Sequence, residues 1–386
     1  MSEQFAESEH RVTPLELFFD LVFVFAFTQV TTLLLEDVTW AGLGRGLLVL
    51  AVLWWAWASY AWLTNTVDAG AGLVLAVMLV AAAAMFVAAL AVPEAFGGHR
   101  LVFAVAFLIV LVMFVGLFAL AGRAEPDLFA AVLRMARTTV LGGALILAAA
   151  FAQSGLRPAL WLAALAVGFF GPALSGVGGW RVHPAHFAER HGLILIIAIG
   201  EALVAIGFGA RGTGLGAGVI LAAVLGLVVA ASFWLAYFDF FSVGVQRMLA
   251  DRRGEQRVAL ARDAYTYLHL PMVAGIVLFA FAMKSTLAHV DAELDVIPAV
   301  ALCGGSALYL LAYVALRWRV SRSLGRGRSV ASVGFVALVP VAVVVPALVT
   351  IALVAAVWLG LHGYELIWWR EERARRRTSG APAASN

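Results

Sequence analysis

Long apolar runs constrain the fold of this chain more than any other feature of its sequence. A helix needs about 20 apolar residues to cross a bilayer, and runs of that length recur between residues 15 and 316. They lie at 15–35, 43–63, 71–92, 100–121, 130–152, 158–178, 187–208, 215–238, 264–288 and 296–316. Runs this long satisfy their backbone hydrogen bonds in lipid as helices. The sequence therefore predicts an all-α polytopic membrane protein, with the lipid bilayer as its partner.

Composition supports the membrane class. Hydrophobic residues make up 63% of the chain and charged residues 13%, whereas soluble domains have about 45–50% and about 25%. The single cysteine, Cys303, excludes an intramolecular disulfide and a Cys-rich metal site. Residues 1–14 are polar and of mixed charge rather than basic and then apolar. We therefore expect no cleavable signal peptide, and the first apolar run is the first span.

A last apolar block, 330–369, would make a single helix of about 60 Å, roughly twice the hydrocarbon thickness. Pro340 and Pro346 interrupt it. Arginines gather on both sides of it, in the segments 240–262, 317–329 and 370–386. The positive-inside rule places these segments in the cytoplasm, so the block should cross twice as a hairpin that turns near Val345–Val349. A single kinked helix is the alternative.

With the hairpin, the chain has about twelve transmembrane helices and both termini in the cytoplasm. We divide it into a cytoplasmic segment 1–14, a transmembrane domain 15–369 and a disordered Arg-rich tail 370–386, which is more typical of contact with anionic headgroups than with nucleic acid. Glu16 and Glu189 each begin a span and lie 173 residues apart. A few further matches at that offset suggest two six-helix repeats, 15–178 and 187–369.

The stretch 186–207 carries the most informative polar residues. It opens with His186, Glu189, Arg190 and His191, and Glu201 follows in the middle of the apolar run. A charged side chain at mid-bilayer costs a few kcal/mol, so Glu201 must be paired, hydrated or protonated. One interpretation is a group that binds a proton or a cation. The other, equally weighted, is a protonated Glu bonded to a neighbouring helix.

Two carboxylates occupy one face of the first span, because Glu16 and Asp20 are four residues apart. They could cap the helix or reach arginines on neighbouring helices, and Gln29 lies deeper on roughly the same side. Arg134 and Arg137 open the fifth span on one face. They are candidate partners for the acids of the first and seventh spans, with a role as topology anchors as the alternative.

Three further features stand out among the polar and aromatic residues of the spans. Asp239 ends the eighth span at its cytoplasmic mouth, and His269 precedes Pro271 in the ninth. We expect His269 in the same cytoplasmic polar cluster as the residues of the seventh span. The second span contains five aromatic residues, which line a cavity or simply pack: Trp54, Trp55, Trp57, Tyr60 and Trp62.

Metal binding is a weaker hypothesis. His183, His186, Glu189 and His191 have spacings compatible with ligands on one helical turn and its lead-in. No known metal signature fits them, so a hydrogen-bonded ionic cluster is favoured. The sequence leaves the cofactor, the metal and the oligomeric state open.

Three segments carry a family resemblance: PLELFFDLVFVFAFTQ at 14–29, ERHGLILIIAIGEALVAIG at 189–207 and YFD at 237–239. With them, nearly the whole chain resembles the bacterial low-temperature-requirement A family of integral membrane proteins. The resemblance implies a multi-pass protein of the bacterial plasma membrane. It singles out Glu16, Asp20, Gln29, Glu189, Gly200, Glu201 and Asp239, and His191 departs from the family's bulky residue. It implies no particular activity.

Three functions compete at this point. The first and favoured one is a secondary transporter coupled to protons or cations, with Glu201 as the ion-binding group. A gating network of charges would then comprise Asp20, Arg134, Arg137, Glu189, Arg190 and Asp239. The second is a membrane-embedded enzyme acting on lipid, in a metal-dependent version or without metal. The third is a non-catalytic membrane protein that supports growth in the cold. An enzyme is the less favoured class, and the small-molecule substrate cannot be read from the sequence.

Overall fold

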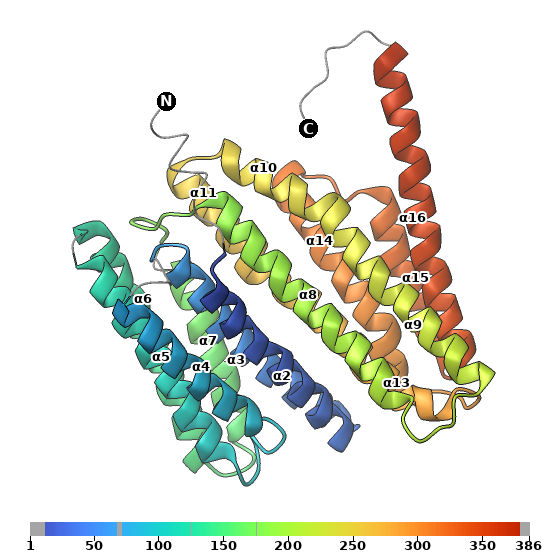
Figure 1. Ribbon diagram of the computed structural model, residues 1–386, viewed down its shortest axis with the longest axis horizontal. Helices are drawn as coiled ribbons and strands as arrows, with labels where there is room; N and C mark the ends of the chain where they lie inside the picture. Colours follow the sequence, from blue (N-terminus) through green and yellow to red (C-terminus); the bar gives the residue numbers. More distant parts are fainter. Residues whose placement is uncertain (1–11, 68–71, 124, 175, 379–386) are drawn as a thin grey trace. The chain divides into compact units, whose positions relative to one another are not determined.

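The computed structural model describes residues 12–67, 72–123, 125–174 and 176–378, and the described chain is helical, with no β-strand (Figure 1). The first eight helices are α2 (Pro14–Glu36), α3 (Trp40–Thr64), α4 (Gly72–Leu90), α5 (Arg100–Gly122), α6 (Pro126–Phe151), α7 (Arg157–Leu174), α8 (Pro184–Gly209) and α9 (Ala217–Ala236). The remaining helices are α10 (Val243–Asp251), α11 (Gly254–Ala261), α12 (His269–Thr286), α13 (Val296–Ala299), α14 (Gly305–Ser321), α15 (Arg326–Ala342) and α16 (Ala347–Thr378). Short π-helical turns continue α9, α11 and α13, at η1 (Tyr237–Ser242), η2 (Arg262–Tyr267) and η4 (Val300–Gly304).

The described residues contain 10 stretches of helix that are long and apolar enough to cross a membrane. This confirms the predicted multi-pass helical membrane protein. The stretches coincide with nine of the ten apolar runs placed above and with α16, whereas α7 and α15 are not among them. The predicted count of about twelve stays a prediction.

Local sequence chemistry explains where the first helix begins. Thr13 is the N-cap of α2: its hydroxyl accepts the backbone N–H of Glu16, and the Glu16 carboxylate accepts the backbone N–H of Thr13. This reciprocal capping box satisfies donors that a helix start otherwise leaves unpaired. Pro14 follows in the first turn, where a missing N–H costs nothing. The Glu16 carboxylate is thereby fixed at the entrance of the first span.

The apolar block 330–369 forms two helices rather than one. α15 ends at Ala342, α16 begins at Ala347, and the two pack against each other. The backbone N–H groups of Ala347 and Leu348 donate to the carbonyls of Ala292 and Val290, at 2.8 and 2.9 Å. The turn therefore lies beside the acidic loop 289–295. α16 overlaps the predicted disordered tail 370–386, whose last part, 379–386, lies outside the described residues together with 1–11.

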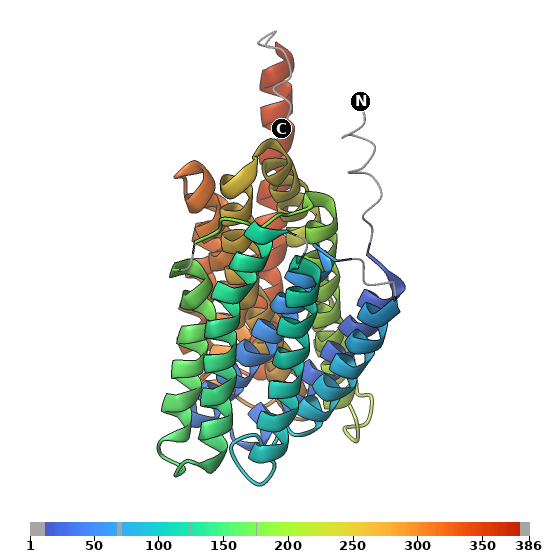
Figure 2. The same ribbon diagram turned by 90° about the vertical axis from the view of Figure 1, so that its left-hand side faces the viewer.

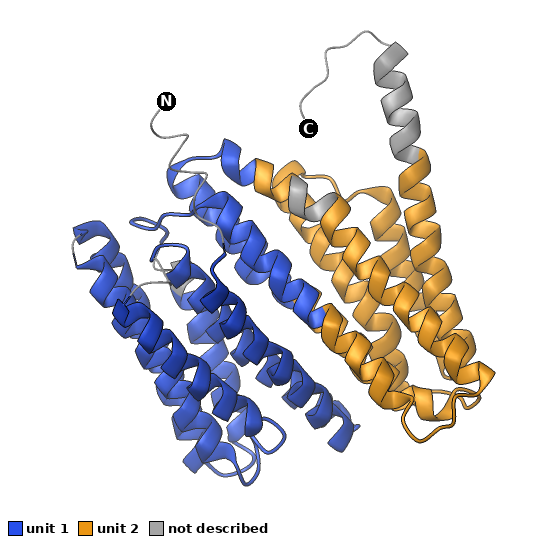
Figure 3. Ribbon diagram, viewed as in Figure 1, with its two compact units in different colours: residues 1–198, 248–270 blue, residues 199–247, 271–386 orange. Residues whose placement is uncertain are grey.

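The chain divides into two compact units (Figure 3). Unit 1 comprises residues 1–198 and 248–270, and unit 2 comprises residues 199–247 and 271–386. The boundary falls inside α8, whose first half belongs to unit 1 and whose second half belongs to unit 2. These limits differ from those of the predicted repeats, 15–178 and 187–369, which stay a prediction.

In unit 1, α4, α5, α6 and α7 pack in sequence against their neighbours, and the last three run side by side in Figure 2. α3 contributes the largest fully buried side chains, Trp54, Trp57 and Tyr60. The Tyr60 hydroxyl donates to the Val110 carbonyl at 2.9 Å, which ties α3 to α5. A Cβ at Gly142 would meet the Trp55 ring at 2.4 Å, so this glycine is what admits the indole against α6. The aromatic second span is thus the centre of this unit.

Unit 2 is held together by close backbone contact and by buried polar bonds. A Cβ on Gly275 of α12 would lie 2.4 Å from the Gly305 carbonyl oxygen of α14, so only glycine permits this approach. The Tyr309 hydroxyl donates to the Phe233 carbonyl at 2.7 Å, joining α14 to α9. These contacts are typical of membrane helices that associate through small residues and interhelical hydrogen bonds.

Candidate functional site

Four charged or titratable side chains meet inside unit 1: Glu16 and Asp20 from α2, and His186 and Arg190 from α8. We call them the buried ion cluster. None is more than 2% exposed. Each pair is four residues apart on its helix, so each presents two groups on one face. Their contact confirms that the two acids of α2 reach an arginine of another helix.

Glu16 lies at the outer end of the buried ion cluster. Its Oε1 is 3.0 Å from Nε2 of His186 and 3.7 Å from Nη1 of Arg190. Its Oε2 accepts the backbone N–H and the hydroxyl of Thr13 at 2.8 and 3.0 Å. Both predicted roles therefore hold at once, because one carboxylate caps the helix and joins the ion pairs.

Arg190 lies between the two carboxylates. Its Nη2 is 2.9 Å from Oδ1 of Asp20, and its guanidinium lies 5.8 Å from the centre of the Trp57 ring. The Trp57 indole N–H also donates to Oδ1 of Asp20, at 2.8 Å. Asp20 is thus held by one ion pair and one hydrogen bond. The hydrogen-bond donor, Trp57, is one of the aromatic residues of the second span, for which the sequence left cavity lining and packing open.

Asn65, at the end of α3, sets the orientation of His186. Its side-chain oxygen accepts the backbone N–H of His183 at 2.9 Å, so its amide nitrogen faces Nδ1 of His186 at 3.2 Å. An amide nitrogen only donates, so Nδ1 of the imidazole is the acceptor and Nε2 carries the proton toward Glu16. No motif in the sequence indicated this role for Asn65.

His191 begins a buried aromatic group beside the buried ion cluster. Its Nδ1 is bonded to the Phe187 carbonyl at 2.8 Å, and its Nε2 has no hydrogen-bond partner among the described residues. Its ring centre lies 4.9 Å from that of Trp57, 4.7 Å from that of Tyr265 and 5.1 Å from that of His269. His269 therefore lies next to the buried ion cluster and packs its ring against that of His191.

Other predicted site residues lie elsewhere. Glu189 is exposed and accepts the backbone N–H of Val12 at 3.3 Å. Arg134 donates to the Gly178 carbonyl at 3.0 Å, and Arg137 is exposed, so neither is the partner of the α2 acids that we predicted. Arg190 takes that place because it faces α2 from the neighbouring helix. Gln29 is half-buried farther along α2.

Glu201 and Asp239 belong to unit 2. Glu201 is 1% exposed within α8, so the chain keeps a carboxyl group inside the protein at this depth of the span. Gly200, its neighbour, has open space beside its Cα and brings no backbone close. Asp239 is exposed in η1, at the end of the eighth predicted span.

The predicted metal ligands do not converge. The described part of the chain contains no group of three or more His, Cys, Asp or Glu side chains arranged to hold a metal ion. His186 faces Glu16 and Asn65, His191 faces the Phe187 carbonyl, and Glu189 points outward. Of the four residues, His186 joins the buried ion cluster, whose other members are Glu16, Asp20 and Arg190.

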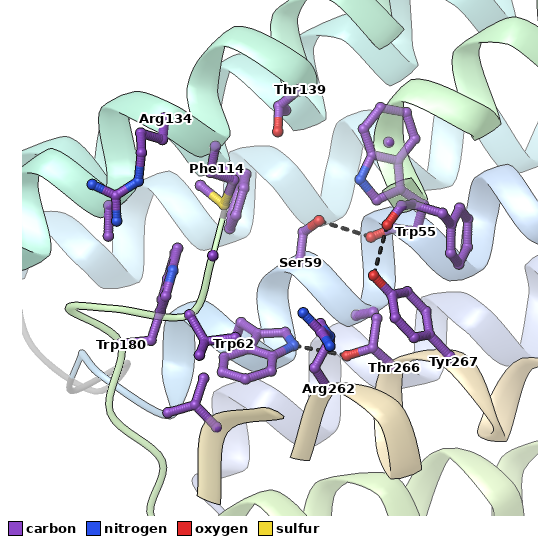
Figure 4. A pocket seen from close by; sticks show the side chains of 18 residues that line it. Trp55, Ser59, Trp62, Phe114, Arg134, Thr139, Trp180, Arg262, Thr266 and Tyr267 are labelled. Atoms are coloured by element: carbon purple, nitrogen blue, oxygen red, sulfur yellow. Dashed lines mark hydrogen bonds between the residues drawn. The ribbon is translucent and has the colours of Figure 1, made fainter. Parts of the chain in front are cut away.

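A pocket opens on the other face of α3, between α3, α6, α7 and η2 (Figure 4). Its volume of about 90 Å³ is well above the roughly 10–15 Å³ that one water requires. Aromatic side chains line part of it, including Trp55 and Trp62 of the second span, so part of that aromatic set does line a cavity. The Trp62 indole N–H donates to the Thr266 hydroxyl at 2.8 Å, which anchors η2 to α3.

The charges of the buried ion cluster do not balance when both carboxylates are ionised. With both carboxylates ionised, Glu16 and Asp20 carry two negative charges and Arg190 carries one positive charge. With His186 in the neutral form that its bond from Asn65 favours, these side chains are neutral together only when one proton is added to a carboxyl group. A net charge is costly where water is excluded.

Comparison with known proteins gives one family and one relative. A family model described as "Bacterial low temperature requirement A protein (LtrA)" matches residues 11–362. An uncharacterized protein of Rhizobium meliloti (strain 1021) is 30% identical over 317 residues, which cover 76% of this chain and 74% of that protein. No solved structure matches. The matched region contains the whole buried ion cluster.

Proposed function

The chain belongs to the bacterial low temperature requirement A family, and on this premise we propose that it is a secondary transporter that couples solute movement to protons or cations. The observation that carries the proposal is the buried ion cluster with its deficit of one positive charge. Ionisable groups inside membrane spans are costly, and they often mark proton relays or ion pathways. The multi-pass architecture supplies the bilayer-spanning frame that a carrier requires.

The buried ion cluster has the chemistry of a switch with two charge states. With one added proton it is neutral and its helices, α2 and α8, are held by balanced ion pairs. Without that proton it carries an excess negative charge, which weakens the attraction between Arg190 and each carboxylate by adding repulsion between them. Protonation thus changes how strongly the two helices are joined, which is what coupling to a conformational change requires.

The position of the cluster suits exchange of protons with one side of the membrane. Glu16 belongs to the first turn of α2, and the neighbouring Glu189 of α8 is exposed. The cluster is therefore about one helical turn from the predicted cytoplasmic surface. His186 of α8 contacts Glu16 of α2 through its Nε2, so both helices contribute to this end of the cluster.

Glu201 supplies a second buried acid. It has 1% exposure in α8, and we propose that it is a proton- or cation-binding group along the path that the solute takes. The free energy that it costs to place a carboxyl group in an apolar span supports a functional role, because a leucine at this position would be more stable in lipid.

We further propose twelve crossings, both termini in the cytoplasm and location in the bacterial plasma membrane. α7 and α15 would be the two shorter crossings in addition to the ten stretches of sufficient length. The separate helices α15 and α16, with their turn beside the acidic loop 289–295, support an even number of crossings. The arginines of 240–262 and 317–329 support the cytoplasmic assignment of those loops.

Solute-driven proton movement tests the transporter directly. Proteoliposomes that contain a pH-sensitive dye would be exposed, at equal pH on both sides, to separate sets of organic anions, organic cations, amino acids and sugars. A coupled carrier moves protons with its substrate, so one class should change the lumenal pH. Glu201→Gln, which removes the ionisable proton but keeps the size, should abolish that change.

Three controls make the assay decisive. Empty liposomes exclude permeation of the solute, thermal unfolding verifies that Glu201→Gln folds, and Glu94→Gln tests an acid near the surface of the 90–99 turn. The transporter proposal fails if no class changes the lumenal pH in folded, reconstituted protein. A Glu201→Gln variant that behaves as the wild type would remove Glu201 from the coupling step.

A further inference from the structure

We propose that the pocket between α3, α6, α7 and η2 is a binding site for an organic anion with a flat apolar body, such as an aromatic ring. Hereafter we call it the aromatic pocket. The proposal concerns equilibrium binding, so it holds or fails independently of whether the anion is transported. It goes beyond the transporter proposal, which names no substrate.

The walls of the aromatic pocket are flat and rigid. Trp55, Trp62, Phe114, Trp180 and Tyr267 line it. The Trp55 ring packs closely against the backbone of α7, because a Cβ at Gly168 would lie 2.8 Å from it. The Tyr267 hydroxyl donates to the Phe169 carbonyl at 2.6 Å, so this ring is also held. Walls that are already ordered lose little entropy on binding, which favours a rigid flat ligand.

One cation of the aromatic pocket is available to a ligand. The half-buried guanidinium of Arg134 donates to the Gly178 carbonyl at 3.0 Å and forms no ion pair within the described part of the chain. Arg262 differs, because it donates twice to Asp263, at 3.0 and 2.9 Å. No acidic side chain is among the described residues that line the pocket.

This difference gives the aromatic pocket an excess of one positive charge on largely apolar walls. A guanidinium that still has free donors binds a carboxylate, sulfonate or phosphate group through charge-assisted hydrogen bonds. In Figure 4, Arg134 and Trp180 lie at one end of the pocket, and Trp55 and Tyr267 lie at the other. A ligand with an anionic group at one end and an apolar ring at the other would match both ends.

The topological role of arginines does not account for this arrangement. A positive-inside anchor needs only to face the cytoplasm or the headgroups, as the exposed Arg137 does one helical turn away. Arg134 instead lines a cavity together with indole and phenol rings. The two arginines of α6 therefore offer a matched comparison of a pocket cation and a surface cation.

The same chemistry, an anionic group on an apolar body, could come from a soluble organic acid or from an anionic phospholipid. The experiment separates these sources. Protein in phosphatidylcholine nanodiscs would be titrated with radiolabelled benzenesulfonate, a permanently charged aromatic anion, and saturable binding would be measured by equilibrium dialysis. Benzenesulfonamide, which has nearly the same shape and no charge at neutral pH, would serve as the competitor. A second arm would replace part of the phosphatidylcholine with phosphatidylglycerol.

We expect saturable binding of benzenesulfonate that an equal concentration of benzenesulfonamide does not displace. Arg134→Gln should weaken binding about ten-fold or more, because it removes a charge-assisted contact. Arg134→Lys should retain most of the affinity, and Arg137→Gln should bind as the wild type. Thermal unfolding of each variant checks that the loss of the bond to Gly178 does not unfold the protein.

The outcomes separate cleanly. An anionic lipid is the occupant if phosphatidylglycerol abolishes benzenesulfonate binding in the wild type. The same conclusion follows if phosphatidylglycerol, without benzenesulfonate, raises the thermal stability of the wild type but not of Arg134→Gln. In both cases the proposal of an anion site is supported. Equal affinity in Arg134→Gln and wild type overturns the proposal. Equal competition by benzenesulfonamide also overturns it, as does the absence of any Arg134-dependent effect of either benzenesulfonate or phosphatidylglycerol.

Discussion

Arg190 has the most demanding environment of any side chain in unit 1. It is fully buried within a membrane span, and its guanidinium is compensated by Asp20 at 2.9 Å and by Glu16 at 3.7 Å. Burial of charges is repaid only where the partners are close and the geometry is good. The Trp57 ring beside the guanidinium adds a cation–π contact, which is stronger where water is excluded.

Removal of the Arg190 charge should therefore be strongly destabilising. Arg190→Met keeps most of the side-chain volume but leaves two buried carboxylates without their cation, at a cost of about 3–5 kcal/mol in the free energy of unfolding. The measurement is unfolding in detergent or nanodiscs, with Arg137→Met as the control at an exposed position of α6. Equal stability of Arg190→Met and wild type would show that the ion pairs contribute nothing.

The residues of the buried ion cluster were mostly visible in the sequence, but their partners were not. Glu16, Asp20, His186 and Arg190 stood out because ionisable residues within or directly beside an apolar span are costly. Asn65 and Trp57 did not, because an amide at a helix end and a tryptophan in a span have ordinary structural explanations. Arg134 was a candidate partner of the acids in the first and seventh spans, but it donates to the Gly178 carbonyl instead. Charge alone does not indicate which face of a helix packs against which neighbouring helix.

The sequence predicted some of the helices and missed others. The apolar runs predicted the spans well, because the length rule depends only on one-dimensional composition. Helices α10 and α11 were not predicted, since they lie in the Arg-rich segment 240–262, where charge concealed any periodic pattern. The split of 330–369 into two helices was predictable because Pro340 and Pro346, together with the length of the block, disfavour one continuous helix.

Helix packing in unit 2 should be sensitive to a single methyl group. Gly275→Ala places a Cβ 2.4 Å from the Gly305 carbonyl oxygen, so α12 and α14 must separate. We expect destabilisation of about 1–3 kcal/mol, as for other overpacked sites. Gly360→Ala in α16 is the control: a Cβ there meets nothing within 4 Å, and alanine should stabilise the helix by about 0.5–1 kcal/mol. Thermal unfolding compares the two, and equal effects would contradict the close approach.

At the scale of the whole molecule, the chain is a multi-pass helical membrane protein with two unusual features in unit 1. The buried ion cluster lies between α2 and α8, and the aromatic pocket lies on the other face of α3. Trp54 connects them, since its indole N–H donates to the Thr266 carbonyl of η2 at 2.8 Å and its ring centre lies 6.3 Å from that of His191. The aromatic pocket and the buried ion cluster are therefore adjoining parts of one packed unit.

Proton counting on the folded protein tests the central claim that the buried ion cluster exchanges one proton. Wild type and Glu16→Gln, each in nanodiscs, would be moved from roughly pH 8 to pH 5 while proton uptake is measured. Glu16→Gln removes one negative charge, so its cluster is already neutral without an added proton. The account predicts that the wild type takes up about one proton more than this variant. Equal uptake by the two proteins would contradict it and would make the cluster a fixed structural ion pair.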